Sequence, residues 1–325
     1  MGYRIREITA GSKFSSAVTL EALSQAVPRA TIEAVLQEEG AVEQRERKMT
    51  MVLVVFTLIA MHLYSHVSLG DVLRKISRGL RFVWPDPEVA APTASALSYR
   101  RYQLGARPLV ALFHRVCRPL VTTQTKGACL YGLRLMASDG TTENVPDTPA
   151  NAAAFGRRHS GRGASAFPQV RCVYLAECGT HAIVDAGVWP CHTSERVGGR
   201  RMLRSVTAGM LVLWDCGFHE DDLLAEVQRR GAHALARLPA HVRPQRVRSL
   251  PDGSYLAYLR PSEYRRRTAG ERLLVRIIEY TITDPALVGY GEVHRLVTTL
   301  RAPALAPALE LVCAYHERSR DRTGD

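Results

Sequence analysis

The segment that decides the fold runs from residue 130 to residue 189. It begins LYGLRLMASD (130–139) and ends PQVRCVYLAECGTHAIVDAGVW (168–189). The first run is a strand candidate that leads into Asp139. The second holds two apolar runs on either side of the turn Cys178-Gly179-Thr180, a pattern typical of a hairpin. Together they predict three successive strands.

The chain beyond the hairpin alternates helices and strands. Residues 195–209 and 220–230 have the apolar spacing of helices, whereas MLVLWD (210–215) and AHALARL (232–238) are short strand candidates. The order of three strands, helix, strand, helix, strand is that of the RNase H-like fold. Three β-type runs then interrupt it and predict a β-rich insertion: SYLAYL (254–259), RLLVRIIEYTI (272–282) and EVHRLVTTL (292–300).

The N-terminal part reads as helical from residue 18 to residue 84, followed by a Pro- and Ala-rich linker to residue 96. Residues 49–70 contain no Asp, Glu, Lys or Arg. Their strongly apolar part, residues 51–64, is too short for the ~20 residues of a membrane span, so it predicts a buried core helix and no membrane partner.

The sequence therefore predicts an α/β chain with a helical N-terminal domain and an RNase H-like mixed-sheet core that carries a β-rich insertion. The expected parts are a helical domain at 1–96, a connecting helix at 97–128, the core at 129–239, the insertion at 240–300 and the final core helix at 301–325.

The composition points to a polyanionic partner. The chain carries 43 Lys and Arg against 31 Asp and Glu, a formal net charge of +12. This charge favours polyanions: nucleic acid first, above all double-stranded DNA, and then an acidic membrane surface or RNA. Arginine far outnumbers lysine, which suits phosphate binding but is equally explained by a GC-rich genome. The seven cysteines include no CxxC pair and the N-terminus has no signal-peptide core, so a cytoplasmic location is expected.

Two aspartates stand where this fold can use them. Asp139 ends the first predicted strand and Asp215 ends the fourth, and these strands are neighbours in an RNase H-like sheet. Their carboxylates can therefore meet at one divalent ion, Mg²⁺ or its substitute Mn²⁺, which prefer oxygen ligands. An Asp at a strand end is also a common turn residue or helix cap, so the spacing alone leaves both readings open.

Several segments together resemble the insertion-sequence-4 (IS4) family of DDE transposases. The resemblance covers about residues 18 to 318. It is carried by AVEQRERKMTMVLVVFTLIAM (41–61), VLRKISRGLRFV (72–83), DGTTENVPDTPANAAAFGR (139–157), CGTHAIVDA (178–186), VLWDCGF (212–218), SLPDGSYLAYL (249–259) and ALELVCAYHER (308–318).

The resemblance implies a function for the chain. It makes Asp139 and Asp215 the first two catalytic carboxylates and metal ligands, and it places Tyr315 and Arg318 in the signature Y-x2-R-x3-E-x6-K, where they contact DNA phosphate. It also implies cut-and-paste transposition. Water attacks the transposon end, the freed 3′ hydroxyl cuts the other strand as a hairpin, and strand transfer into target DNA follows, with a homodimer in the DNA complex.

The chain departs from the family pattern after Arg318. The third carboxylate of the signature is expected at position 322, which is Arg322, and Glu317 and Asp321 fall on other helical faces. The sequence thus predicts a C-terminally truncated transposase with very poor cleavage. Two hypotheses remain: an impaired enzyme, or a non-catalytic DNA-binding remnant that occupies transposon ends.

Other groups of residues have both a functional and an ordinary reading. Asp147, Asn151 and Phe155 either order the loop after Asp139 or form a turn and helix cap. Arginine groups track DNA backbone or are solvated surface; they lie at 157/158/162, 200/201/204, 243/246/248 and 265–267.

Two further constellations are disfavoured. The four side chains of Cys178, His181, Cys191 and His192 have a spacing that fits zinc fingers poorly. A DGT string also occurs in haloacid dehalogenase phosphatases, but Ala137 stands where they need the nucleophilic Asp.

Overall fold

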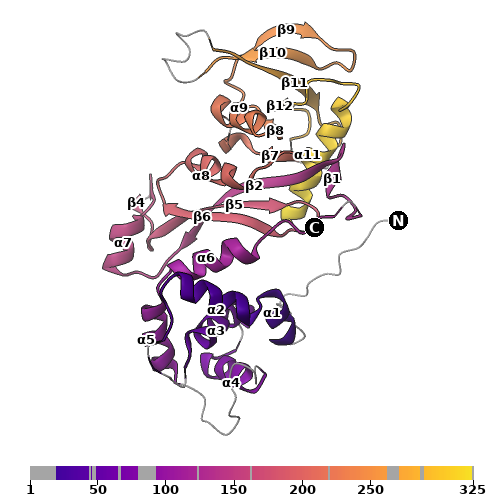
Figure 1. Cartoon of the computed structure of the whole chain (residues 1–325). Coiled ribbons are helices and arrows are strands. Elements are labelled where there is room, and N and C mark those ends of the chain that lie inside the picture. The colour runs from indigo at the N-terminus through magenta and orange to yellow at the C-terminus, as the bar shows by residue number, and fades with distance from the viewer. Residues whose placement is uncertain are drawn as a thin grey trace. The chain divides into compact units, whose positions relative to one another are not determined.

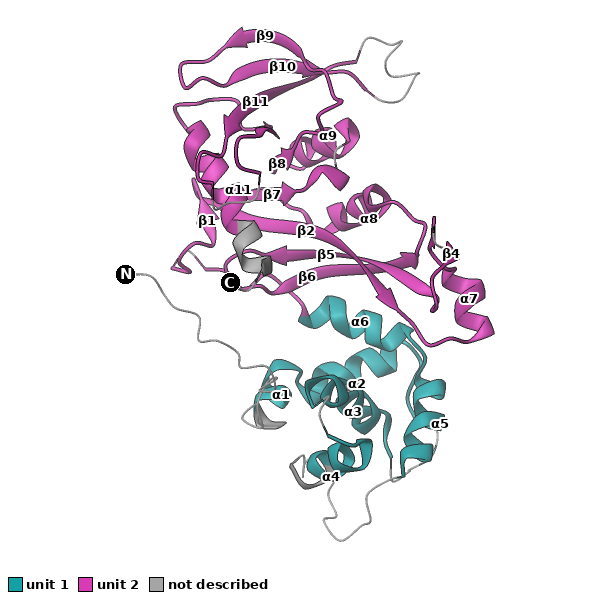
Figure 2. Ribbon diagram, turned by 180° about the vertical axis from the view of Figure 1, so that it is seen from behind, with its two compact units in different colours: residues 1–116 teal, residues 117–325 magenta. Residues whose placement is uncertain are grey.

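The computed structural model describes residues 20–43, 45, 49–64, 67–79, 93–122, 124–161, 163–218, 220–261, 271–285 and 289–323. It forms two compact units, residues 1–116 and 117–325, which Figure 2 colours separately. The predicted linker residues 85–92, Arg162 and Arg265 to Arg267 lie outside the described residues, as do the side chains of Arg318 and Arg322.

The described part of the first unit is helical, and its central helix is α3 (Met51–Leu63). Residues 51–57 are all buried, which confirms the prediction of a buried core helix. Thr50 starts this helix by accepting a hydrogen bond from the Leu53 N–H at 3.2 Å. None of the described helices combines the length and the apolar character needed to cross a membrane. The other helices are α1 (Leu20–Ala26), α2 (Arg29–Glu38), α4 (Leu69–Gly79), α5 (Ala94–Leu104) and α6 (Arg107–Val116).

Helix α5 begins within residues that the sequence assigned to a linker. The cause is a local cap: the Thr93 hydroxyl accepts a hydrogen bond from the Ala96 N–H at 3.2 Å. Both α5 and α6 belong to the first compact unit.

The second unit is built on one mixed sheet with the order β6-β5-β2-β7-β8-β12-β11-β10-β9 (Figure 1). Strands β5 and β6 form the predicted hairpin and run antiparallel to β2, whereas β7 and β8 run parallel to β2. This is the strand order of the RNase H-like fold, so the predicted fold class is confirmed. The elements are β2 (Leu133–Asn144), β5 (Gln169–Glu177), β6 (Ile183–Pro190), α8 (Glu195–Met202), β7 (Met210–Trp214), α9 (Asp221–Arg229) and β8 (His233–Arg237).

The residues predicted as a β-rich insertion extend the same sheet. They form β9 (Gln245–Ser249), β10 (Tyr255–Leu259), β11 (Leu273–Thr281) and β12 (Val293–Thr298), and β12 pairs with β8. Strand β9 was not predicted because all five of its residues are exposed, so it lacks apolar alternation. The remaining elements are β1 (Cys129–Leu130), α7 (Pro149–Phe155), β3 (His159–Ser160), β4 (Gly163–Ala164), η1 (Leu203–Ser205), η2 (Cys216–Phe218) and α11 (Ala308–Thr323).

The sheet carries an apolar layer on each face because successive side chains of β2 and β7 point to opposite sides. One layer joins β2 and β7 to α8 and α9 through Met136, Val212, Trp214, Met202 and Leu223. The other joins the same strands to α11 through Leu135, Leu211, Leu213, Leu311 and Tyr315.

Candidate active site

Asp139 and Asp215 stand at matching positions on neighbouring strands. The parallel pairing of β2 with β7 ends at the pair Ala137 and Leu213, and each aspartate lies two residues beyond its member of that pair. Neighbouring strands are ~4.8 Å apart, so the register brings the two aspartates to one edge of the sheet. Both are half-buried.

The prediction that Asp139 ends its strand is wrong. Strand β2 continues to Asn144 because β5 pairs with it over the whole distance, up to Asn144 opposite Gln169. What ends near Asp139 is the pairing with β7, whose last residue is Trp214. Asp139 therefore stands at the point where β2 no longer has its parallel neighbour.

Strand alternation also assigns the two aspartates to one face. Asp139 follows Leu135 at even spacing, and Asp215 follows Leu211 and Leu213, all of which pack in the layer that includes α11. The face that carries the aspartates is thus the face that α11 covers.

A third carboxylate, which the sequence did not reveal, lies beside this pair. Glu195 begins α8, and its side chain lies between two glycines that follow the aspartates. A Cβ atom added to Gly140 would lie 2.7 Å from Glu195 Cγ and 2.9 Å from Oε1. A Cβ atom added to Gly217 would overlap Glu195 Oε2 and lie 3.1 Å from Asp215 Oδ1.

Close packing of α8 places Glu195 there. A Cβ on Gly198 would come 2.8 Å from Val173 Cβ, so only glycine lets the helix lie this close to β5. The turn η1, which directly follows the helix, is held by the fully buried carboxylate of Asp185, which accepts hydrogen bonds from Arg204 Nε and Ser205 Oγ, both at 2.7 Å. These interactions fix α8 through Gly198 and through the turn after its last residue.

The turn after β7 holds Asp215. Trp214 and Phe218 are buried and stack with ring centroids 6.5 Å apart. Asp215 Oδ1 accepts a hydrogen bond from the Gly217 N–H at 2.9 Å. The aromatic pair thus anchors a short turn that orients the carboxylate.

The surroundings of Glu195 favour its protonated form. Burial raises the pKa of Glu195, and the nearby carboxylates of Asp215 and Asp139 raise it further, whereas Arg171 and Arg158 oppose the increase. Arg171 Nη1 donates a hydrogen bond to Glu195 Oε1 at 2.8 Å. Three carboxylates therefore interact at one edge of the sheet.

The donors suit a divalent ion, although no ready-made cage is present. Among the described side chains, no three from His, Cys, Asp and Glu are gathered tightly enough to hold a metal as they stand. Asp139 and Asp215 nevertheless offer oxygen ligands at matched register, the kind that Mg²⁺ and Mn²⁺ prefer. The space that Gly140 and Gly217 leave is filled by a third carboxylate.

Comparison with known proteins relates the chain to the transposases of IS4-type insertion sequences. Residues 17–114 match the family model "Insertion element 4 transposase N-terminal". The chain is 26% identical over 288 residues to the transposase InsG of insertion sequence IS4 from Escherichia coli K12, covering 87% of this chain and 62% of InsG. It is 31% identical over 153 residues to InsZ of the same strain, also named as a transposase, covering 45% of this chain and 49% of InsZ. The chain is therefore similar to transposases of the IS4 family.

The chain spans less than two thirds of the length of either relative. A synaptic complex of piggyBac transposase with hairpin DNA also aligns with it, with a TM-score of 0.41 and 12% identity over 91% of this chain and 63% of that one. The fold assignment follows from the strand order.

Helix α11 runs toward the two aspartates. Near its start, Ala306 O accepts a hydrogen bond from Arg276 at 2.6 Å, and further on His316 meets the Tyr280 hydroxyl at 2.8 Å. Along β11, Tyr280 lies level with the carboxyl end of β8, whereas Arg276 lies nearer the amino end of β8. The helix therefore points toward the end of β7 that carries Asp215.

The two signature residues predicted to contact DNA both lie on α11. Tyr315 packs in the layer against the sheet and is 7% exposed, so little of it is available to DNA in this structure. Arg318 lies one turn further along the helix. Their contacts with DNA stay predictions.

The loop that the sequence placed after Asp139 follows Asn144 in the structure and is held by its own side chains. Asp147 forms an ion pair with Arg157, and the Asn151 side chain donates to Pro146 O at 2.9 Å. Thr148 caps α7 by accepting from the Asn151 N–H at 3.1 Å. The Phe155 carbonyl accepts from the Cys191 N–H at 2.9 Å, which ties the loop to the residues before α8.

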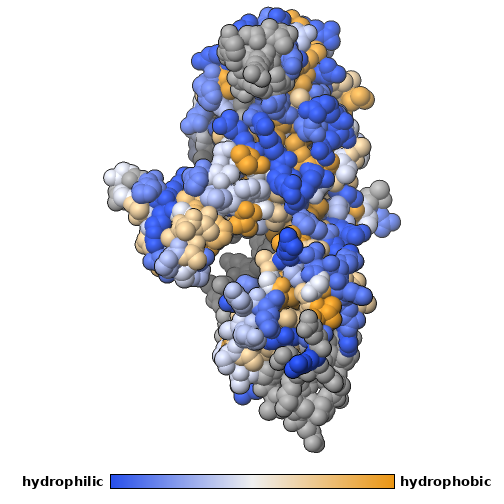
Figure 3. All heavy atoms as spheres, turned by 60° about the vertical axis from the view of Figure 1, so that its left-hand side comes forward, coloured by the Kyte–Doolittle hydropathy of each residue, from blue (hydrophilic) through white to orange (hydrophobic). Residues whose placement is uncertain are grey.

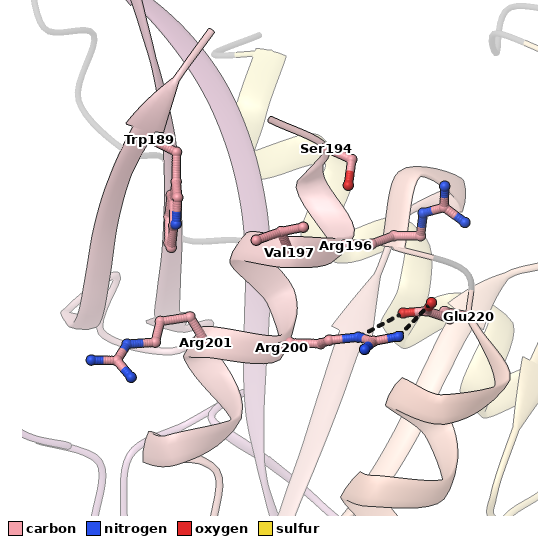
Figure 4. Close-up of a pocket in the computed structure, with 7 residues that line it drawn as sticks. All are labelled: Trp189, Ser194, Arg196, Val197, Arg200, Arg201 and Glu220. Carbon is pink, nitrogen blue, oxygen red and sulfur yellow. Dashed lines mark hydrogen bonds and ion pairs between the residues drawn. The ribbon is translucent and has the colours of Figure 1, made fainter. Parts of the chain in front are cut away.

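Basic side chains follow Glu195 along α8. A hollow of about 740 Å³ is lined by Arg196, Arg200, Arg201, Trp189 and Glu220, with Ser194 and Val197 (Figure 4). Arg200 forms an ion pair with Glu220 at 2.6 Å, whereas within the described residues Arg196 and Arg201 form none. On the molecular face drawn in Figure 3, hydrophilic residues predominate.

Other predicted arginines are used within the fold. Arg204 pairs with Asp185, Arg157 pairs with Asp147, and Arg246 lies 4.4 Å from the centre of the Tyr255 ring. Their side chains make contacts within the protein in this structure. Arg196 and Arg201 of α8 are the better candidates for binding DNA phosphate.

Proposed function

We propose that this chain is the transposase of a bacterial insertion sequence, acting in the cytoplasm on the ends of its element by metal-dependent hydrolysis of a phosphodiester bond. The observation that carries the proposal is the matched register of Asp139 and Asp215 on neighbouring parallel strands of an RNase H-like sheet. The family supports it, because the relatives InsG and InsZ are named as transposases.

In this proposal Asp139 and Asp215 hold Mg²⁺ or Mn²⁺. When bound, the ion supplies positive charge that polarises the phosphate and activates water. The chain's own part is to fix the two carboxylates: β2 is paired on both sides up to Ala137, and the turn anchored by Trp214 and Phe218 orients Asp215. Fixed carboxylates lower the reorganisation that the reaction requires.

The DNA partner follows from charge. The net charge of +12 and the arginines of α8 provide a surface that attracts phosphate, starting one residue after Glu195. A DNA strand that follows these arginines passes close to the carboxylates, so binding and cleavage occupy adjoining surfaces.

One observation favours a second candidate. Position 322, where the family signature has its third carboxylate, is Arg322, and a guanidinium there would repel a divalent cation. A chain that binds element ends without cutting them would be a non-catalytic DNA-binding protein.

The experiment is a nicking assay on labelled DNA that carries the ends of the element encoding this chain, with Mg²⁺ or Mn²⁺. The comparison set is the chain as it stands, Asp139→Asn and Asp215→Asn. Metal-dependent nicking that both variants lose would support the transposase. Binding of the ends without nicking would favour the second candidate, and failure to bind them would contradict both.

A further inference from the structure

We infer that Glu195 is the third carboxylate of the proposed metal site, joining Asp139 and Asp215 in the role that the family signature gives to position 322. The inference rests on the proposed function, because the ion belongs to that proposal. It goes further by assigning a ligand on α8, which lies on the opposite face of the sheet from α11.

The Glu195 carboxylate is directed toward the aspartates with one of its two oxygens. Oε1 accepts the hydrogen bond from Arg171, and Oε2 is the atom that a Cβ on Gly217 would overlap. The same Cβ position is 3.1 Å from Asp215 Oδ1. The two carboxylate oxygens therefore lie within roughly 5 Å of each other, so a small side-chain rotation would let them share one divalent ion.

The identity of two glycines also supports this assignment. Gly140 directly follows Asp139, and Gly217 lies two residues after Asp215. Neither has the positive φ angle for which glycine is usually required. At both positions the backbone would tolerate alanine, and the atoms nearest to an added Cβ belong to Glu195. The chain thus keeps open, beside each aspartate, the space that the Glu195 carboxylate fills.

Glu195 also has access to Asp215 past the end of β7. Strand β7 ends at Trp214, one residue before Asp215, whereas β2 continues to Asn144. Gly198 lets α8 lie close to β5, which brings Glu195 near this edge of the sheet. A side chain from the α8 face therefore reaches Asp215 around the end of β7.

A purely structural role for Glu195 makes a different prediction. An acidic residue in the first turn of a helix is stabilised by the helix dipole, and its pairing with Arg171 adds to this. If that were its whole role, Glu195→Gln would lower stability slightly and leave metal affinity unchanged. Metal affinity is thus the property that separates the two roles.

The test is isothermal titration of the full chain with Mn²⁺ alone. Glu195→Gln should weaken Mn²⁺ binding about tenfold or more, and Glu195→Asp, which keeps the charge on a shorter arm, should weaken it less. The matched control is Glu226→Gln, because Glu226 also pairs with arginine, on α9. Asp139→Asn reports on the proposed site itself. Thermal unfolding verifies that each variant is folded.

The outcomes separate the two claims. Weaker binding in Glu195→Gln and in Asp139→Asn, with Glu226→Gln unchanged, supports both. Unchanged binding in Glu195→Gln alongside weaker binding in Asp139→Asn overturns the role of Glu195 and leaves the proposed function standing. Mn²⁺ binding that is absent from the chain, or unaffected by Asp139→Asn, overturns the metal site and with it the inference.

Discussion

A methyl group added at Gly217 should weaken metal binding while leaving the chain folded. In Gly217→Ala the new Cβ would overlap Glu195 Oε2 and lie 3.1 Å from Asp215 Oδ1. The φ angle of Gly217 is not positive, so alanine adopts this backbone without strain. The substitution thus acts on the Glu195 carboxylate and removes no charged group.

The expected size follows from the geometry. Restoring an ordinary separation requires the carboxylate to move by about 1 Å, and turning a flexible side chain off its preferred rotamer costs about 0.5–1.5 kcal/mol. We therefore expect the free energy of unfolding to fall by about 1 kcal/mol. Ligand distances in metal sites tolerate only about ±0.2 Å. A shift of this size should therefore lower Mn²⁺ affinity about tenfold, or ~1.4 kcal/mol.

The assay pairs Mn²⁺ titration with urea unfolding, and its control is Gly161→Ala, because a Cβ at Gly161 meets nothing within 4 Å. The control should match the unaltered chain in both measurements. The reasoning is refuted if Gly217→Ala binds Mn²⁺ as tightly as Gly161→Ala. A decrease of more than about 3 kcal/mol in stability, which is typical of a broken buried ion pair, would show that Glu195 is instead a rigid structural element.

Three further predictions concern the framework of the site. Burial alone would raise the pKa of Asp185, but hydrogen bonds from Arg204 and Ser205 outweigh it and lower the pKa. The ionised carboxylate therefore stabilises the fold fully above about pH 4, and this contribution disappears as pH falls through the lowered pKa. Asp185→Asn should therefore lower the free energy of unfolding, measured in urea at pH 7, by about 2–3 kcal/mol; the value is moderate because Arg204 is 33% exposed. The loss should be smaller at pH 3, and equal losses at both pH values would contradict this. Arg196→Ala combined with Arg201→Ala should lower the affinity for DNA in anisotropy titrations. It should also reduce the slope of log affinity against log salt concentration by about one for each phosphate that the variant no longer binds, whereas the control Arg229→Ala should change neither. An unchanged slope would show that α8 does not contact the DNA. Gly198→Ala should cost about 1–3 kcal/mol in thermal unfolding because its Cβ would meet Val173, and a cost below about 0.5 kcal/mol would show that α8 has room to move.

The order of elements around the site was predictable because its signals are local. The hairpin of β5 and β6 follows from two apolar runs around a short turn, and β7 follows from an uninterrupted apolar run, as expected for a strand buried on both faces. Once the order is fixed, the fold brings Asp139 and Asp215 together. The matching register of the two aspartates on neighbouring strands can therefore be predicted from the sequence.

The position of Glu195 beside the aspartates could not be predicted in the same way. An acid at the start of a helix is ordinary, since the helix dipole favours it. Its approach to Asp215 depends on the close packing of Gly198 on Val173, a tertiary interaction with no local signature. A weak signal did exist in the small residues Gly140 and Gly217 beside the two aspartates. The burial of Tyr315, expected to contact DNA, likewise depends on how α11 packs on the sheet.

The most direct test of the account is the position of a bound ion in crystals of the chain grown with Mn²⁺, located by its anomalous scattering. The account predicts a peak about 2.2 Å from carboxylate oxygens of both Asp139 and Asp215, with Glu195 as the third ligand. A peak bound elsewhere, or aspartate carboxylates more than about 10 Å apart, would contradict it, because no single ion could then join them.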